Sequence, residues 1–327
     1  MHNRRSGRGP ALTEIGFGAA QLGNLNRELD DDSARETVDT AWDAGIRYFD
    51  TAPHYGLGLS ETRLGAALAS HPRDEFVLST KVGRLLVEDP DGVERPDDDG
   101  FIVTTSLRRQ WDFSRDGILR SVDESLRRLG VDRLDIAYLH DPDEHWEAAS
   151  TTAIDALIEL RDQGVVSAIG AGMNQAAMLA EFVRRCDVDI MMVAGRYTLL
   201  DQSAASDLLP LADERGVAVV AAAIYNSGML SSDRPREGAR FDYRDAPDDV
   251  IAKTHAIADV CERHGTSLPA AAIAFPLRSS VVTSVAVGMR GASQVLSTLE
   301  RYSAAPPPEL WDELEELGLI GTDARRG

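Results

Sequence analysis

Short apolar runs alternate with amphipathic stretches along almost the whole chain, and this alternation limits the fold more than any other feature. The apolar runs predict eight strands, at residues 14–20, 48–50, 76–82, 134–140, 168–172, 190–194, 217–222 and 284–288. The amphipathic stretches predict helices at residues 31–44, 60–69, 115–129, 152–163, 175–185, 202–215, 247–264 and 291–302. Nearly continuous apolar strands are typical of parallel strands buried on both faces. The regular strand–helix order therefore indicates parallel βαβ units.

Residues 115–129 show how a helix is predicted from this pattern. Ile118, Val122 and Leu126 recur four positions apart, so they lie on one face of a helix. Charged residues occupy most of the opposite face. Gly130 follows directly and supplies a typical helix end.

Eight strand–helix units over about 250 residues or more match a (β/α)8 TIM barrel. The alternative is a doubly wound sheet, which carries G-x-G-x-x-G after an early strand. Gly16, Gly18 and Gly23 do not have that spacing. We therefore predict an α/β fold, a (β/α)8 TIM barrel in a single domain over residues 1–327. The longer segments 84–114 and 226–247 both follow strands, so we expect them to be loop insertions on the active-site face.

Charge and composition exclude several classes of function. The 327 residues carry a net charge of −20, which argues against nucleic acid or an anionic membrane as the main partner. No apolar stretch of about 18 residues exists to span a membrane. The start, MHNRRSGRGP, leads into no apolar run, so we expect no secretory signal. Two cysteines fit a cytoplasmic protein without a disulfide framework or metal cage, and both monomer and homodimer remain open.

Polar residues stand at or just after the ends of three predicted strands, where a barrel carries its catalytic groups. Lys81 ends an apolar strand and would be costly to bury unpaired, but Asp50 on the adjacent strand can pair with it. An ammonium beside the Tyr55 hydroxyl favours the phenolate and lowers its pKa, so this tyrosine can exchange protons. His140 can orient a substrate oxygen. Together these residues predict proton transfer at an oxygen, and their spacing supports no metal site.

These residues lie in motifs that resemble those of the aldo-keto reductase superfamily, in a match that runs over residues 12–317. FDTAPHYGLGLSETRLGAAL resembles the family's second-strand signature, STK its third-strand lysine, and SVDESLRRLGVDRLDIAYLHDPD its helix–strand segment ending in histidine. The resemblance implies a (β/α)8 barrel, a nicotinamide cofactor and a catalytic tetrad of Asp50, Tyr55, Lys81 and His140. It implies that Tyr55 exchanges the proton, while Lys81 tunes it and Asp50 holds Lys81. His140 aligns the oxygen.

The resemblance also implies the cofactor contacts. GAGMN places Asn174 at the turn that binds the carboxamide in the family. SVAVGMRGASQVLSTLE resembles the C-terminal cofactor segment, with Gly288 and Arg290 before a helix start that can receive a phosphate. Gln294 occupies a position where NADP-preferring members often carry arginine. A neutral residue there favours NAD, and NADP remains the alternative because Arg290 can supply a guanidinium.

Two positions depart from the family pattern. Ala194 stands where glutamine is usual, and Ala222 stands where an aromatic residue usually stacks on the cofactor. Tyr225, three residues further on, is a possible substitute for that aromatic residue.

A narrower likeness bears on the substrate. GMN, AGRYTLL, YNSG and VGM resemble the branch of aldose 1-dehydrogenases acting on L-fucose, D-threo-aldoses or L-galactose, together with pyridoxal 4-dehydrogenase. These substrates share a cyclic hemiacetal that becomes a lactone when hydride leaves. We expect His54 and Trp111 to contact such a substrate. The alternatives are pyridoxal oxidation, NADPH-dependent reduction of aldehydes or ketones, and a nicotinamide-binding regulatory subunit.

Overall fold

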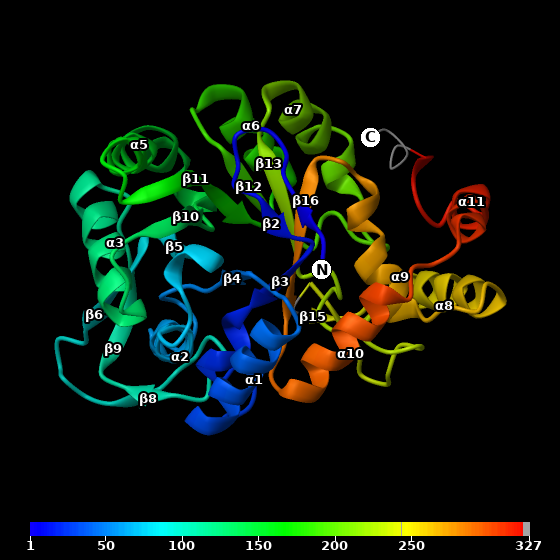
Figure 1. Cartoon of the computed structure of the whole chain (residues 1–327), viewed down its shortest axis with the longest axis horizontal. Helices are drawn as coiled ribbons and strands as arrows, with labels where there is room; N and C mark the ends of the chain where they lie inside the picture. Colours follow the sequence, from blue (N-terminus) through cyan, green and yellow to red (C-terminus); the bar gives the residue numbers. More distant parts are fainter. Residues whose placement is uncertain (243, 323–327) are drawn as a thin grey trace.

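The structure is a computed structural model, and it describes residues 1–242 and 244–322. Within these residues, eight parallel strands close into a barrel in the order β10-β11-β12-β13-β16-β3-β4-β5, as Figure 1 shows. They are β3 (Ile15–Gly18), β4 (Tyr48–Asp50), β5 (Val77–Val82), β10 (Leu134–His140), β11 (Val166–Met173), β12 (Ile190–Ala194), β13 (Ala218–Ala222) and β16 (Val282–Gly288). The predicted (β/α)8 barrel is confirmed.

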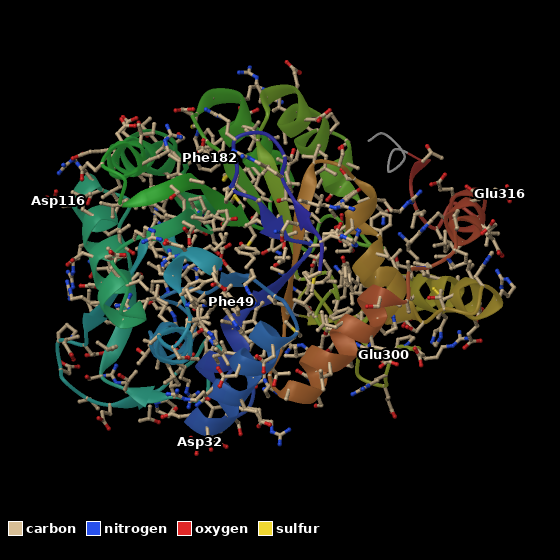
Figure 2. All side chains as sticks on the ribbon, in the orientation of Figure 1. Asp32, Phe49, Asp116, Phe182, Glu300 and Glu316 are labelled. Carbon is tan, nitrogen blue, oxygen red and sulfur yellow. The ribbon has the colours of Figure 1, made fainter. Side chains whose placement is uncertain are left out.

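Helices surround this barrel and bury its outer face. They are α1 (Asp31–Asp43), α2 (Leu59–Leu68), α3 (Arg115–Leu129), α4 (Trp146–Ala148), α5 (Ile154–Asp162), α6 (Ala176–Arg185), α7 (Leu208–Arg215), α8 (Asp248–Arg263), α9 (Leu268–Ala274), α10 (Ala292–Ser303) and α11 (Pro308–Glu316). Figure 2 shows Phe49 and Phe182 inside the molecule, with Asp116 and Glu316 at its edge. Among the described residues, none of the helices combines the length and apolar character needed to cross a bilayer.

Helix ends follow the local sequence closely. The predicted helix 115–129 forms as α3, between a Ser114 side chain that accepts from Gly117 N and a Gly130 with φ 68°. The predicted helix 202–215 is wrong in its first part, because α7 begins only at Leu208 after a separate 3-10 turn. Pro210 explains the break, since it has no N–H to continue a helix that started earlier.

The chain departs from the barrel in a long segment between β5 and α3. It folds into two hairpins: β6 (Arg84–Glu88) with β9 (Leu107–Trp111), and β7 (Arg95–Pro96) with β8 (Thr104–Thr105). In Figure 1 the segment projects in teal at the lower left. Its tip reaches the loop after β3, where Asn26 N donates to Gly100 O at 2.8 Å and Leu25 forms a β-bridge with Phe101. We call residues 84–111 the mouth loop.

A second long segment follows β13 and contains the short hairpin β14 (Arg240–Phe241) and β15 (Arg244–Asp245). Position 243 of this segment and residues 323–327 of the predicted domain lie outside the described residues. Arg196, just beyond β12, holds the segment through an ion pair with Asp242 at 2.8 Å. Both long segments therefore start from the carboxyl ends of barrel strands.

The strand order brings the predicted catalytic groups together. β4, β5 and β10 are consecutive around the barrel, with Asp50 level with Ser79 and Tyr138 level with Lys81. Because all strands are parallel, the carboxyl ends of these three meet at one edge. Asp50, Lys81 and His140 therefore share that edge.

Candidate active site

A buried ion pair forms the base of the site. Lys81 Nζ lies 2.7 Å from Asp50 Oδ2 and also donates to the Thr51 carbonyl oxygen at 2.9 Å. Lys81 and Asp50 are only 3% and 4% exposed. Burial by itself lowers the pKa of Lys81, but the Asp50 carboxylate and Tyr55 together more than offset this, so the pKa is raised. The lysine therefore stays an ammonium.

Ser79 completes the set of hydrogen bonds to Asp50. Its Oγ donates to Asp50 Oδ1 at 2.7 Å, on the carboxylate oxygen that Lys81 leaves free. It also lies 3.1 Å from the Tyr48 hydroxyl, which is 3.5 Å from the Tyr138 hydroxyl. We did not predict Ser79, although its place two residues before Lys81 on a strand puts both side chains on the same face.

Tyr55 lies in the turn that follows β4. The turn closes against the loop after β3. Gly56, in the turn, has φ 64°, and a Cβ on it would come within 2.4 Å of the Gly23 carbonyl oxygen in that loop. Only glycine fits there. Lys81 Nζ is 4.8 Å from the centroid of the Tyr55 ring. The turn thus presents the tyrosine to the ammonium.

The pKa of Tyr55 differs from the value expected from the sequence, which was a lowered one. Burial raises the pKa of the Tyr55 hydroxyl, and the Lys81 ammonium lowers it. The expected effect of Lys81 is present, but burial is the larger effect and leaves the pKa above its usual value. The lysine therefore reduces, but does not remove, the rise in pKa that burial imposes on the Tyr55 hydroxyl.

Two neutral histidines stand beside Tyr55. Burial, followed by the charges of Arg84 and Lys81, holds the pKa of His140 well below its usual value. The pKa of His54 falls to about 2, chiefly through burial. The His140 ring centroid lies 6.0 Å from that of Tyr55 and 5.5 Å from that of His54. Each histidine is therefore an uncharged hydrogen-bonding group at physiological pH.

A cavity of about 470 Å³ opens beside His140. This volume falls within the usual range for small-molecule sites. Arg84, Trp111, Asp141, Asp143, Glu144, His145, Asn174 and Gln175 line it. Trp111, which we predicted to contact the substrate, is among them. His54, the other predicted substrate contact, is not in the lining; its Nδ1 lies 3.4 Å from Nη1 of Arg84, which is.

Arg84 and Asp141 are further polar residues of this cavity that we did not predict. Arg84 hydrogen-bonds Asp141, and its guanidinium lies 4.2 Å from the Trp111 ring centroid. The sequence signal was only their position, because Arg84 follows the third strand by two residues and Asp141 follows His140 directly.

The predicted cofactor residues lie at the carboxyl ends of β11 and β16. Asn174 Nδ2 donates to the Ala194 carbonyl oxygen at 2.9 Å. A side chain at Gly288 would collide with Gln21, whose Nε2 would be 2.5 Å from a Cβ there. Gln294 Oε1 accepts from the backbone N–H of Arg290 at 2.7 Å, so it turns back onto the start of α10.

The two departures from the family pattern stand side by side at the ends of neighbouring strands. Ala194 ends β12 and is in register with Ala222, which ends β13. Both are partly exposed. Tyr225, the possible aromatic substitute, packs against the hydrophobic core.

The residues present fit an extended polar cofactor. Several buried polar atoms lack a hydrogen-bond partner among the described residues, and three of them belong to this side of the barrel: Gln21 Oε1, Asn226 Oδ1 and Arg290 Nε. They belong to the segments after β3, β13 and β16, which are neighbours in the barrel. The start of α10 has no side-chain cap from Gly291, which leaves backbone N–H groups for a phosphate.

Comparisons with known proteins agree with this geometry. Residues 14–318 match the model of the aldo/keto reductase family. The chain is 49% identical to a D-threo-aldose 1-dehydrogenase from Pseudomonas sp., over 96% of each chain. It is 38% identical to a pyridoxal 4-dehydrogenase from Microbacterium luteolum, over 95% of this chain and 96% of that relative.

A solved structure supports the same conclusion. The holo form of an aldo-keto reductase from Bacillus halodurans superposes with a TM-score of 0.75 at 27% identity, covering the whole of both chains. The family model and the first relative each extend over nearly the full length. The chain belongs to the aldo/keto reductase family of NAD(P)-dependent oxidoreductases.

Proposed function

We propose that this protein is an NAD-dependent aldose 1-dehydrogenase that oxidises the cyclic hemiacetal of a sugar to a lactone. The observation that carries the proposal is the 49% identity to a D-threo-aldose 1-dehydrogenase over nearly the full length. The polar cavity beside His140, with Trp111 in its wall, supports it, because sugars offer both hydroxyl groups and apolar C–H faces.

The tetrad performs the proton transfer. Tyr55, as the phenolate, takes the proton from the C1 hydroxyl. Lys81 stabilises this phenolate, and Asp50 and Ser79 hold the lysine in place from the barrel interior. Neutral His140 hydrogen-bonds the C1 oxygen and fixes its distance from Tyr55. A nicotinamide cofactor bound at the ends of β11 and β16 would accept the hydride.

Cofactor choice depends on the start of α10. Gln294 is neutral and is already engaged with the backbone N–H of Arg290. A 2′-phosphate needs a cationic partner, so this arrangement favours NAD. Gln294→Arg should raise kcat/KM for NADP relative to NAD by about tenfold. An unchanged ratio would place the adenosine end of the cofactor elsewhere.

Initial rates of reduced-nicotinamide formation test the proposal. The purified protein is assayed with NAD or NADP and with L-fucose, D-arabinose, L-galactose or pyridoxal. Turnover of a sugar with NAD supports the proposed aldose 1-dehydrogenase activity. Turnover of pyridoxal alone assigns the chain to the activity of its 38%-identical relative. Silence on all four, with NADPH-dependent reduction of aldehydes, makes it a carbonyl reductase; tight cofactor binding without any turnover favours a regulatory subunit.

A further inference from the structure

We propose that Arg84 and Asp141 form a clamp that recognises the hydroxyl on the sugar carbon next to the reacting one. This inference rests on the proposed function, because it names how that site selects among aldoses. The clamp explains why a salt bridge stands in the wall of a cavity where a neutral substrate is expected.

The clamp lies beside the atom that holds the reacting oxygen. Asp141 Oδ2 is 3.6 Å from His140 Nε2. A sugar whose C1 oxygen bonds to His140 therefore places the substituent of its neighbouring carbon close to this carboxylate. Asp141 follows His140 directly in the chain, so the two side chains start from adjacent backbone positions.

The backbone fixes the direction of the Asp141 side chain. Asp141 adopts φ 40°, in the left-handed region, between His140 and Pro142. Its N–H donates to Gly172 O at 3.0 Å, which fixes the residue to the end of β11. Aspartate tolerates this conformation better than most residues but still adopts it infrequently. The unusual turn directs the carboxylate into the cavity.

The clamp offers the pair of groups that a hydroxyl requires. A carboxylate accepts a hydrogen bond, and the adjacent guanidinium donates one, while a sugar hydroxyl does both. The side chains of Arg84 and Asp141 are 14% and 34% exposed, so a substrate can reach them. Trp111 supports the guanidinium from behind, and His54 contacts its edge. The groups are therefore held in place before the sugar arrives.

The charge of the cavity also limits the substrate. Asp141, Asp143 and Glu144 contribute three carboxylates to the lining, against the single guanidinium of Arg84. Like charges across a binding surface disfavour a partner. The cavity therefore suits a neutral polyol rather than a sugar phosphate or sugar acid.

Three pentoses isolate the contact that the clamp would make. D-arabinose carries the C2 hydroxyl, D-ribose carries it inverted, and 2-deoxy-D-ribose lacks it. We would measure kcat/KM for NAD reduction with each sugar, for the wild type, Asp141→Asn and Glu144→Gln. Glu144→Gln is the matched control, since it removes one carboxylate from the same lining without touching Arg84.

The wild type should prefer D-arabinose to both other sugars. Asp141→Asn should lower kcat/KM for D-arabinose by about 30-fold and for 2-deoxy-D-ribose by no more than about threefold. Glu144→Gln should change all three sugars by one small factor. Dividing the variant's kcat/KM by that of the wild type for each sugar cancels any difference in the intrinsic reactivity of the sugars.

Two results would overturn the clamp alone. One is a wild type that oxidises 2-deoxy-D-ribose as well as D-arabinose. The other is an Asp141→Asn variant that slows every sugar equally, which assigns the pair a structural role. If this variant fails to fold or to bind NADH, the same ratio measured on Arg84→Lys decides. A wild type that oxidises no aldose overturns the proposed function first, and the clamp with it.

Discussion

The barrel interior and the mouth loop both hold charged side chains, but they hold them differently. Asp50, Ser79 and Lys81 come from adjacent strands, and each is at most 4% exposed. Arg84 and Arg109 come from a hairpin outside the barrel and are partly exposed. The interior is fixed by the register of the barrel strands, whereas the mouth loop is fixed by its own hairpin pairing and by contacts with neighbouring loops. The first therefore suits chemistry that every substrate shares, and the second suits the choice of substrate.

The degree of burial determines how much stability or activity each region loses when one charged side chain is removed. A charge inside the barrel that loses its partner has no water to replace it, so the cost is high. The mouth-loop arginines are somewhat more exposed, at 14% for the Arg84 side chain and 13% for that of Arg109, so water can replace part of a lost partner. Substitutions in the interior should thus reduce the rate or the stability strongly, while those in the mouth loop should mainly change substrate affinity.

The largest effect is expected from Tyr55→Phe, which removes only the proton carrier. We expect kcat to fall by about 10³-fold, with NADH binding retained in a fluorescence titration. The pH profile sharpens this. Oxidation needs the phenolate, and the pKa of Tyr55 is raised by burial despite Lys81, so wild-type kcat should rise with pH into the alkaline range. A variant with a near-normal rate would remove Tyr55 from the reaction.

Lys81→Met should abolish most turnover and also destabilise the barrel. It leaves the Asp50 carboxylate buried without its partner, which costs about 3–5 kcal/mol of unfolding free energy in urea titrations. Adding Asp50→Asn should restore much of that stability but none of the activity. Recovery of turnover in the double variant would contradict the assigned role of the ammonium.

Ser79→Ala tests whether the interior acts as a unit. The Asp50 carboxylate loses its hydrogen bond at Oδ1, so we expect kcat to fall by about tenfold with KM little changed. Ser284→Ala is the matched control. Ser284 is also fully buried inside the barrel, but among the described residues its Oγ has no hydrogen-bond partner. Equal losses in the two variants would mean that only packing matters there.

The smallest effect is expected from Arg109→Gln in the mouth loop. Arg109 pairs with Asp97 and Asp99, and its Nη2 donates to the His54 carbonyl oxygen at 3.0 Å. We expect KM for the sugar to rise about threefold while kcat is unchanged. Arg108→Gln, at an exposed position on β9, should leave both constants alone. A fall in kcat for Arg109→Gln would break the separation between the two regions.

The local spacing of apolar residues predicted most of the fold, because it indicates which face of each helix or strand can be buried. The helix at 115–129 was predicted with its observed ends, since its apolar spacing and its cap are both local. The hairpins of the mouth loop were not predicted as strands. Residues 89–106 do contain turn sequences, Asp-Pro-Asp-Gly at 89–92 and Asp-Gly at 99–100, but they do not show that β6 pairs with β9 across the whole stretch. Pairing of this kind depends on contacts with the rest of the fold, such as those between the mouth loop and the loop after β3.

The predicted catalytic groups and the cavity also differ in how far the sequence could predict them. The alternation of apolar and amphipathic segments was enough to predict the barrel. It also predicted that Asp50, Lys81 and His140 share one edge, because the carboxyl ends of parallel strands meet there. Three features became visible only in the folded chain: Ser79 donates to the free oxygen of Asp50, burial outweighs Lys81 in setting the pKa of Tyr55, and Arg84 hydrogen-bonds Asp141. Such contacts depend on distance and solvent exclusion between remote residues, and periodicity along a chain encodes neither.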